Sequence, residues 1–456
     1  MPKPFRVREL YCPSHFGNSY EVAGPAEMRA TLAEARFWGF NRYSDWFDTV
    51  DLRNPYEKHD GLFDMPEAVW ARKFANYSIA ASLGFDLGLV VTPNHVFMEQ
   101  VTPANEAEKV AGRIFGQLVC PSKPGATEMI LQNYRRIFQD FKDRDLRLKA
   151  ISSGAYDYGG CNCPSCRPWI VTFGRLTRRI VEAARDYFPE VKADLWAWWW
   201  TDEDHQEFAR WADREAPGFF DALAHHLPYD ANSYRKRPVP AGCKERAFVH
   251  IGYGEIRGND VYGHYGPTVA PGRLERTVAF LAREQADGFL AYSEGVYDDA
   301  NKAIVAGLGS GQFKTAESVL RAYAARYLGG DTDAWSAWLG QMGRIDAVEP
   351  AKARRQFDAL ASVSKPSWRL RALAEKLAMR EADAAVNAAA EWDDVRLAAA
   401  VRFWAAKERL WREVWGLGLG RHAFKFDLMS PGWHAEYVKR TGERMEHGRR
   451  LTADEA

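Results

Sequence analysis

Short apolar runs recur along the first part of the chain, and each is followed by glycine, asparagine, acidic or aromatic residues. Apolar runs of about four to eight residues between turn-forming residues are typical of buried strands. The pattern predicts strands at residues 6–11, 40–46, 86–92, 146–152, 192–199, 219–227, 247–253 and 288–292.

Longer stretches between these runs have apolar residues every three or four positions, which predicts amphipathic helices. The clearest cover residues 26–37, 125–142, 173–187 and 272–285. Alternating strands and helices over about 300 residues favour a closed (β/α)8 TIM barrel. An open doubly wound sheet should carry a glycine-rich phosphate loop after its first strand. Residues 11–15, Tyr-Cys-Pro-Ser-His, do not form such a loop.

The sequence changes character near residue 312, where Ala, Leu, Arg, Glu and Trp dominate and strand-like runs disappear. Helical spacing continues at residues 315–327, 332–344, 366–383 and 393–415. We therefore expect a catalytic TIM-barrel domain over residues 1–311 and an α-helical C-terminal domain over residues 312–456. Because that helical domain is rich in tryptophan, a homodimer interface there is one further expectation.

Basic and acidic residues balance, with 61 Lys plus Arg against 61 Asp plus Glu in 456 residues. A chain without net charge has no field that attracts nucleic acid, so a neutral partner such as a small carbohydrate is favoured. No segment reaches the roughly 18 apolar residues that cross a bilayer, and the N-terminus lacks a signal-peptide pattern. We expect a cytoplasmic protein that does not bind membranes.

Residues that follow the strands are the first candidates for chemistry, because reactive groups of TIM barrels lie at the C-terminal ends of the strands. These positions hold Cys12 and His15, Asp45, Trp46 and Asp48, Asn94 and His95, Asp157, Thr201 and Asp202, Tyr229 and Asp230, Glu255, and Glu294. Carboxylates between aromatic walls suit hydrolysis of a glycosidic bond. One acid protonates the leaving oxygen, and another acts as base or nucleophile.

The clearest carboxylates are Glu255, in Gly-Tyr-Gly-Glu, and Glu294, in Tyr-Ser-Glu-Gly. They follow neighbouring strands, which lie about 4.8 Å apart in a sheet, and we expect them to be the catalytic acid and base. The alternative is that either glutamate binds loop backbone or an arginine such as Arg257. Asp157 lies across the barrel from the last strand, where it would bracket a substrate. Its alternative role is a turn that caps the glycine pair after it.

The run Trp-Ala-Trp-Trp-Trp at residues 196–200 ends the fifth predicted strand. Alternate strand residues face the same way, so Trp196, Trp198 and Trp200 should share one face. Three indoles crowd a barrel interior, so Trp200 or Trp199 is expected at the mouth as a platform for a sugar ring; alternatively, all four pack in the core. The predicted substrate-binding residues are Tyr158, Trp198, Trp200, Asp202, Trp46, His95, Tyr253 and Tyr292. Asp202 also has the sequence context of a helix cap.

Three cysteines, Cys161, Cys163 and Cys166, lie in one short loop, and a tetrahedral zinc site needs four ligands. Cys120 follows the third strand, next to that loop, and is the expected fourth ligand. Cys12 is less convenient, because the first strand lies further around the barrel. Four thiolates form a closed, structural zinc site with no place for water. The alternative is a group of plain buried thiols. We expect no organic cofactor and no disulfide framework.

Several short motifs together resemble a group of carbohydrate enzymes. They are Asp157 before Gly-Gly-Cys-x-Cys-x-x-Cys, the upstream Cys-Pro-Ser-x-Pro, the later Tyr-Ser-Glu-Gly, and the helical stretch at residues 323–330. Over about residues 5–345 the chain resembles the hexosaminidase-like and α-glucuronidase-like TIM-barrel glycoside hydrolases, which include families 20 and 163. The resemblance implies a glycosidase barrel and leaves the substrate open.

Family 20 enzymes carry an adjacent Asp-Glu pair after the fourth strand. There the Asp orients the 2-acetamido group of the substrate, and the Glu is the general acid. Asp157 matches the Asp, but Tyr158 stands where the Glu would be. A phenol with a pKa of about 10 is a poor general acid. The family 20 mechanism is therefore not expected intact, and the acid chemistry is expected at Glu255 and Glu294.

Three functions compete on this sequence. The favoured one is a glycoside hydrolase, exo-acting on a small oligosaccharide or glycoside. The second is a non-catalytic carbohydrate-binding protein on a degenerate barrel, which Tyr158 in the acid position suggests. The third is a metal-dependent barrel hydrolase or isomerase with ligands among His15, His95, Asp45 and His250.

Overall fold

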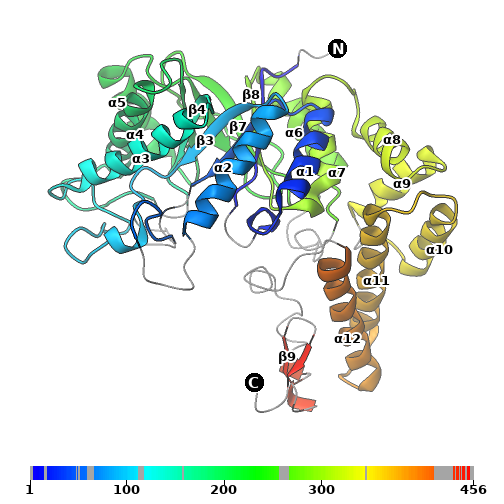
Figure 1. Ribbon diagram of the computed structural model, residues 1–456. Coiled ribbons are helices and arrows are strands. Elements are labelled where there is room, and N and C mark those ends of the chain that lie inside the picture. Colours follow the sequence, from blue (N-terminus) through cyan, green and yellow to red (C-terminus); the bar gives the residue numbers. More distant parts are fainter. Residues whose placement is uncertain are drawn as a thin grey trace.

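The computed structural model describes residues 4–14, 18–47, 49, 52–58, 66–110, 118–156, 159–255, 267–344, 347–414, 435–436, 438–440, 442, 444–446 and 449–451. A closed eight-stranded barrel, covered by helices, is followed by further helices (Figure 1). The predicted TIM barrel with a helical C-terminal region is confirmed. No helix in the described residues is long and apolar enough to span a membrane.

Eight parallel strands form the barrel in the order of the sequence. They are β1 (Val7–Tyr11), β2 (Arg42–Trp46), β3 (Asp86–Val91), β4 (Leu148–Gly154), β5 (Lys192–Ala197), β6 (Ala222–His226), β7 (Lys244–His250) and β8 (Gly288–Tyr292). Each overlaps one of the predicted runs. β8 pairs with β1 and so closes the barrel. Gly288 is needed at this closure, because a Cβ there would lie 1.9 Å from the carbonyl oxygen of Val7.

Helices cover the outside of the barrel between most strands (Figure 1). They are α1 (Pro25–Trp38), α2 (Pro66–Ser82), α3 (Ala126–Asp143), α4 (Trp169–Arg185), α5 (Asp202–Glu215), α6 (Pro271–Arg283) and α7 (Asp299–Gly309). The four predicted helices correspond to α1, α3, α4 and α6. α2 was not predicted, because its buried face includes the polar residues Lys73 and Asn76, which blur the apolar spacing. Residues 227–243, between β6 and β7, contain no helix.

The C-terminal region consists of α8 (Ala316–Tyr327), α9 (Thr332–Met342), α10 (Pro350–Ala361), α11 (Trp368–Ala388) and α12 (Asp394–Arg409). A π-helical turn, Leu410–Val414, follows α12, and two short strands, β9 (Arg444–Glu446) and β10 (Arg449–Leu451), pair antiparallel. Short 3-10 helices lie in the barrel loops at Ser19–Glu21, Met98–Gln100 and Val296–Asp298. All four helical segments predicted after residue 312 are found, and α10 is additional.

One half-buried carboxylate joins the C-terminal helices to the barrel. Asp299, which begins α7, accepts hydrogen bonds from Arg369 of α11 at 2.6 and 3.1 Å and from the Tyr323 hydroxyl of α8 at 2.7 Å. Lys376 of α11 donates to the carbonyl of Pro267, between β7 and α6, at 2.6 Å. α11 therefore packs against loops at the C-terminal ends of the strands, on the side of the barrel opposite the N-terminus (Figure 1).

The barrel interior combines large aromatic rings with very small residues. Trp196, Phe248 and Tyr292 point inward from β5, β7 and β8 and belong to one buried cluster. Gly154 faces this cluster from β4, and a Cβ there would lie only 2.6 Å from the Trp196 ring. The glycine thus provides the space for the indole, because an interior at close-packed density cannot hold both.

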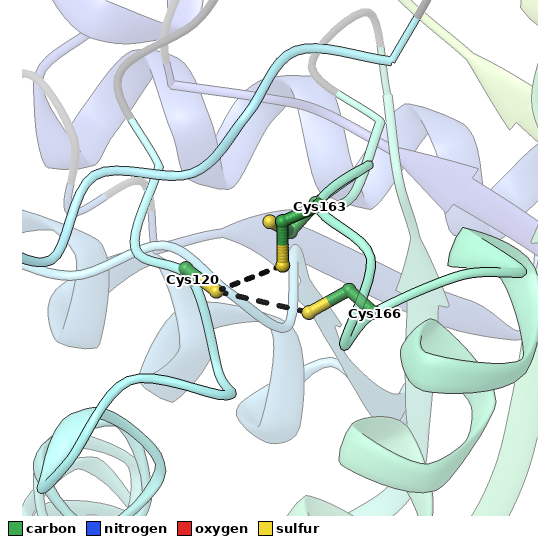
Figure 2. Close-up of side chains that lie close together, drawn as sticks. Cys120, Cys163 and Cys166 are labelled. Carbon is green, nitrogen blue, oxygen red and sulfur yellow. Dashed lines mark hydrogen bonds between the residues drawn. The ribbon is translucent and has the colours of Figure 1, made fainter.

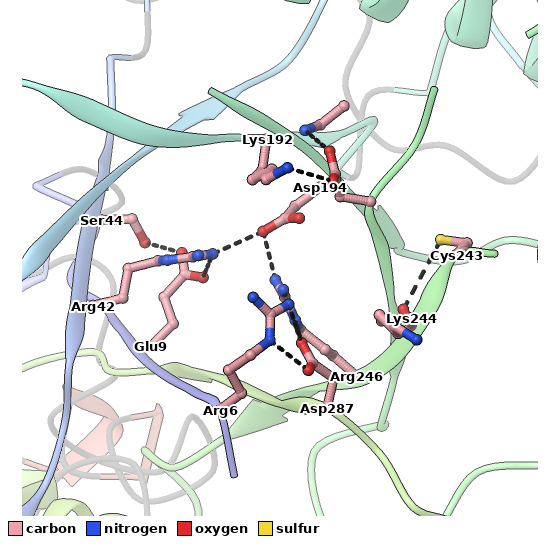
Figure 3. A network of polar contacts seen from close by, with 12 residues as sticks. Arg6, Glu9, Arg42, Ser44, Lys192, Asp194, Cys243, Lys244, Arg246 and Asp287 are labelled. Atoms are coloured by element: carbon pink, nitrogen blue, oxygen red, sulfur yellow. Dashed lines mark hydrogen bonds and ion pairs between the residues drawn. The ribbon is translucent and has the colours of Figure 1, made fainter. Parts of the chain in front are cut away.

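The opposite end of the interior is charged. Asp194 of β5 accepts hydrogen bonds from Arg42 of β2 at 2.7 Å and from Arg246 of β7 at 2.5 Å. Glu9 of β1 lies 3.4 Å from Arg42, and Asp287 bonds Arg246 at 3.1 Å. Figure 3 shows these side chains converging near the N-terminal ends of the strands. The barrel is therefore held at this end by a buried ionic network, which we call the barrel-floor network.

Candidate active site

Aromatic side chains fill the C-terminal end of the barrel. The ring of Trp46, at the end of β2, stacks on Tyr156, with centroids 4.8 Å apart and planes at 15°. The Tyr156 hydroxyl lies 2.6 Å from that of Tyr11. Trp198 lies 5.5 Å from Tyr156 and 4.2 Å from the His226 ring. The rings of Trp46, Tyr156 and Trp198 are almost completely buried and belong to one cluster at this end of the barrel, which we call the aromatic wall.

Glu294 lies directly after β8 at this mouth, and only 4% of its surface is exposed. The Tyr297 hydroxyl donates to its Oε2 at 3.2 Å. Burial and the nearby Glu294 charge raise the pKa of Tyr297 well above its usual value, so that the hydroxyl keeps the proton it donates. Gly252, just after β7, lies beside the glutamate, since a Cβ there would be in ordinary van der Waals contact, 3.4 Å from its Cγ. The structure thus places a buried, oriented carboxylate where the sequence predicted one.

Asp298 fixes the turn that carries Glu294, and the sequence analysis did not single it out. It accepts from the Glu294 backbone N–H at 3.1 Å and from the Ser293 hydroxyl at 3.0 Å. Lys302 pairs with it at 2.5 Å and also donates to the Gly295 carbonyl at 2.7 Å. The sequence contained a signal for this ion pair, because Lys302 follows Asp298 by four residues at the start of a helix. This network limits the freedom of the Glu294 backbone.

Glu255, predicted as a catalytic partner of Glu294, binds the N-terminus of α6 in this structure. Its Oε1 accepts from the backbone N–H of Gly272 at 2.6 Å, and its Oε2 accepts from that of Arg273 at 2.9 Å. Arg276 adds a side-chain contact at 3.3 Å. The free N–H groups and positive dipole of a helix N-terminus favour a carboxylate there. The alternative considered from sequence, binding to backbone and an arginine, is what the structure contains.

Replacing Glu255 by Ala should lower the free energy of unfolding by about 1–2 kcal/mol, because the first N–H groups of α6 lose their acceptor. Urea unfolding followed by circular dichroism measures the change. Glu349→Ala is the matched control, because Glu349 caps α10 through two N–H groups at an exposed position. A loss for Glu255→Ala no larger than that for Glu349→Ala would contradict this role.

Asp202 is also bound elsewhere, at the surface. It begins α5 and accepts from Arg235 at 2.9 Å and from Arg237 at 2.7 Å, both in the connection between β6 and β7. The Arg237 hydrogen bond is the main cause of its lowered pKa. The neighbouring cap is formed by Thr201 and Asp204, whose side chains each accept from the other's backbone N–H. Asp202 therefore links two loops, and its role in substrate binding stays a prediction.

The tryptophan run does not keep the alternation of a strand. β5 ends at Ala197, and Trp199 adopts a left-handed backbone with φ of 55°. Trp200 consequently turns outward and packs against Phe173 and Phe208, which corrects its predicted place at the mouth. Trp199 emerges instead and is 49% exposed. Its ring lies 6.3 Å from Trp198, so it extends the aromatic wall outward.

The remaining predicted binding residues line the same end of the barrel. His95 lies 5.5 Å from Trp46, and Tyr292 lies 5.4 Å from His250. Tyr253 contacts the His250 ring at 5.7 Å. The Nε2 atoms of His226 and His250 are 3.2 Å apart, so one ring donates to the other. His226 was not among the predicted residues, although, like His250, it is the last residue of its strand.

Four of the candidate residues lie outside the described part of the chain: His15, Asp48, Asp157 and Tyr158.

The Asp45 carboxylate binds the loop after β1. It accepts hydrogen bonds from the backbone N–H and the hydroxyl of Ser14 at 2.9 and 2.6 Å. Among the described residues, the metal-ligand group that comes together consists of cysteines and includes neither His95 nor His250. The metal-dependent hydrolase or isomerase stays a prediction, because His15, one of its proposed ligands, lies outside the described residues.

Four cysteines do meet, as the sequence predicted. The Sγ atoms of Cys120, Cys161, Cys163 and Cys166 all lie within 4.8 Å of one another. Figure 2 shows Cys120 approaching Cys163 and Cys166 from a different loop. Burial raises the pKa of Cys161 to about 11. All six cysteines of the chain are free thiols in this structure.

No protein-family model matches the chain. No curated protein matches its sequence. Solved structures with a similar arrangement include the β-amylase catalytic domain of Paenibacillus polymyxa, at 8% identity, covering 67% of this chain and 98% of that one, with a TM-score of 0.43. A GH138 enzyme described as targeting pectin rhamnogalacturonan II is 9% identical, with coverages of 96% and 63% and a TM-score of 0.49.

A third similar structure is GH5_18 from Streptomyces cattleya in complex with GlcNAc, at 12% identity, with coverages of 75% and 93% and a TM-score of 0.43. Tandem GH20 modules of a pneumococcal exo-β-D-N-acetylglucosaminidase also match. The matches thus span several families and do not single out families 20 and 163. At such identities they compare backbone arrangement alone.

Proposed function

We propose that the protein is a glycoside hydrolase in which Glu294 acts on the glycosidic bond. The observation that carries the proposal is the buried Glu294 carboxylate, oriented by Tyr297 after β8, at the end of the barrel that also holds the aromatic wall. The C-terminal ends of the strands are where TIM barrels hold their reactive groups. An oxocarbenium-like transition state needs a carboxylate close to the anomeric carbon, and aromatic faces suit the apolar faces of a sugar.

A second carboxylate is needed opposite Glu294, and Asp157 is our candidate. The strand order β1 to β8 places the end of β4 across the barrel from β8. Glu255 no longer competes for this role, since α6 binds both of its oxygens. A separation of about 5–5.5 Å between the two carboxyl groups would predict retention at the anomeric carbon, and one of about 6.5–9.5 Å would predict inversion.

The exposed Trp199 supports an oligosaccharide as substrate. An open groove runs beside it, lined by Asn162, Arg167, Trp169, Glu203 and Glu207 among others. An indole flanked by amide, guanidinium and carboxylate groups offers a stacking face together with hydrogen-bond partners for hydroxyl groups. We place the terminal sugar in the mouth and the next unit on Trp199, which corresponds to exo-action on a small oligosaccharide.

The activity is tested on a panel of aryl glycosides and short oligosaccharides of different sugars and anomeric configurations. The proposal predicts turnover of at least one substrate, with a released reducing sugar. Calorimetric titration of the same sugars distinguishes the non-catalytic alternative. Sugar binding with no product after prolonged incubation would contradict hydrolysis and favour a carbohydrate-binding protein.

Replacing Trp199 by Ala should weaken oligosaccharide binding without affecting the fold. Loss of one stacking face costs about 0.5–1.5 kcal/mol, which corresponds to a rise in KM of about 2- to 13-fold. Steady-state kinetics on an oligosaccharide measures KM, and thermal unfolding measures Tm. Phe37→Ala is the control, because Phe37 is similarly exposed, at 50%, but lies on α1. An unchanged KM for Trp199→Ala would remove Trp199 from the substrate site.

A further inference from the structure

We propose that Cys120, Cys161, Cys163 and Cys166 bind one zinc ion. The four thiolates would form a closed site that cross-links two loops at the C-terminal end of the barrel. Cys120 lies between β3 and α3, and the other three lie between β4 and α4. The proposal is independent of the glycoside hydrolase assignment, because it rests on the geometry of these four sulfurs.

The sulfur separations fit a tetrahedron around one metal ion. Cys120 Sγ lies 3.8 Å from Cys163 Sγ and 3.7 Å from Cys166 Sγ. A tetrahedral ion with Zn–S bonds of about 2.3 Å has sulfur atoms about 3.8 Å apart along each edge. A disulfide would require sulfurs about 2.05 Å apart, and all four cysteines are free. Two loops distant in sequence thus present their thiols at the spacing of a metal site.

The ligand type and the surroundings favour zinc. Thiolate ligands select soft or borderline ions, and four sulfurs in a tetrahedron are typical of structural zinc. Cys120, Cys161 and Cys166 are almost completely buried. The Ser122 hydroxyl lies 2.9 Å from Cys166 Sγ, where it can donate to a thiolate. Binding converts four thiols into thiolates and releases their protons, which leaves the zinc tetrathiolate with a net charge of −2.

The zinc site would cross-link the loop after β3 to the loop after β4, close to Tyr156. The backbone N–H of Asn162 donates to the Glu108 carbonyl at 2.9 Å, and that of Cys120 donates to the Asn105 carbonyl at 2.8 Å. The first bond joins the loop after β4 to the loop after β3, and the second fixes Cys120 within the loop after β3. A metal ion adds a covalent-strength link a few residues after Tyr156, whose ring stacks on Trp46. Four protein ligands leave no position for water, so the ion is structural.

Metal content of the purified full-length chain tests the proposal without any substrate. Elemental analysis should find about one zinc per chain, and X-ray absorption should find four sulfur neighbours at about 2.3 Å. Titration with an organomercurial should release the ion as the thiols react. Less than about 0.1 zinc per chain after expression with added zinc would overturn the proposal. So would a disulfide between any two of the four cysteines.

Two variants locate the site. Cys166→Ser should lose its zinc, whereas Cys243→Ser should keep about one ion per chain. Cys243 is the matched control because it is a buried cysteine far from the cluster in sequence. Ser122→Ala should keep the fold and weaken zinc binding by about 10-fold or more in competition with a chelator. If Cys166→Ser does not fold, the Ser122→Ala measurement decides. Unchanged affinity in Ser122→Ala and full zinc content in Cys166→Ser would each contradict the site.

Discussion

The Glu294→Gln variant is expected to lose glycoside hydrolysis, with kcat lowered by about 10²- to 10⁴-fold on the best substrate of the wild-type protein. The substitution keeps the size of the side chain and an acceptor for the Tyr297 hydroxyl. It removes the negative charge and the ability to exchange a proton. Because the amide occupies the same space, Tm should change little while kcat falls.

Glu255→Gln is the control for this experiment. Both glutamates follow neighbouring strands, and both side chains are largely buried, but α6 binds Glu255. We expect Glu255→Gln to affect Tm more than kcat. If Glu294→Gln kept wild-type kcat, Glu294 would not be the reacting carboxylate. If both variants lost activity equally at unchanged Tm, the assignment of Glu255 to the helix cap would be wrong.

Arg246→Met is expected to cause the largest loss of stability, about 3–5 kcal/mol in the free energy of unfolding. Arg246 is buried between Asp194 and Asp287 in the barrel-floor network. Burial alone would raise the pKa of Asp194, but the charges of Arg246 and Arg42 outweigh it and hold that pKa below its usual value. Without Arg246, the buried Asp194 carboxylate would keep only Arg42 as a positively charged partner.

Urea unfolding of Arg246→Met and of a surface control measures this difference. Arg135→Met removes a comparable ion pair, with Glu128, in which both side chains are exposed. Exposed pairs contribute at most about 1 kcal/mol, so the control should be nearly as stable as the wild type. A loss for Arg246→Met no greater than for Arg135→Met would show that the barrel-floor network does not stabilise the fold.

The strands were predictable because each is a short apolar run that ends at a turn. In this barrel the strands are neighbours in the order of the sequence, so the topology follows once the strands are found. The ionic floor was not predictable. Asp194 and Arg246 are strand residues whose inward direction is visible only once the register is known. Their pairing depends on strands that lie far apart in sequence, and no local pattern encodes it.

The positions of Glu294, Trp46 and Tyr292 at the C-terminal end of the barrel were predictable, because they follow directly from where β8 and β2 end. The contacts of other residues were not predictable, because they depend on a second element or on a local change of backbone conformation. The role of Glu255 depends on the N-terminus of α6, which returns to that loop after a further stretch of chain. The direction of Trp200 depends on the left-handed backbone at Trp199, which alternation along a strand does not anticipate.

The most direct test of the central claim is a crystal structure of the Glu294→Gln variant soaked with the glycoside that the wild-type protein hydrolyses. We expect a sugar ring in the barrel mouth, with the side chain at position 294 within hydrogen-bonding reach, about 2.6–3.2 Å, of the glycosidic oxygen or in contact with the anomeric carbon. A sugar bound in the mouth with its scissile bond remote from position 294, or bound outside the mouth altogether, would contradict it.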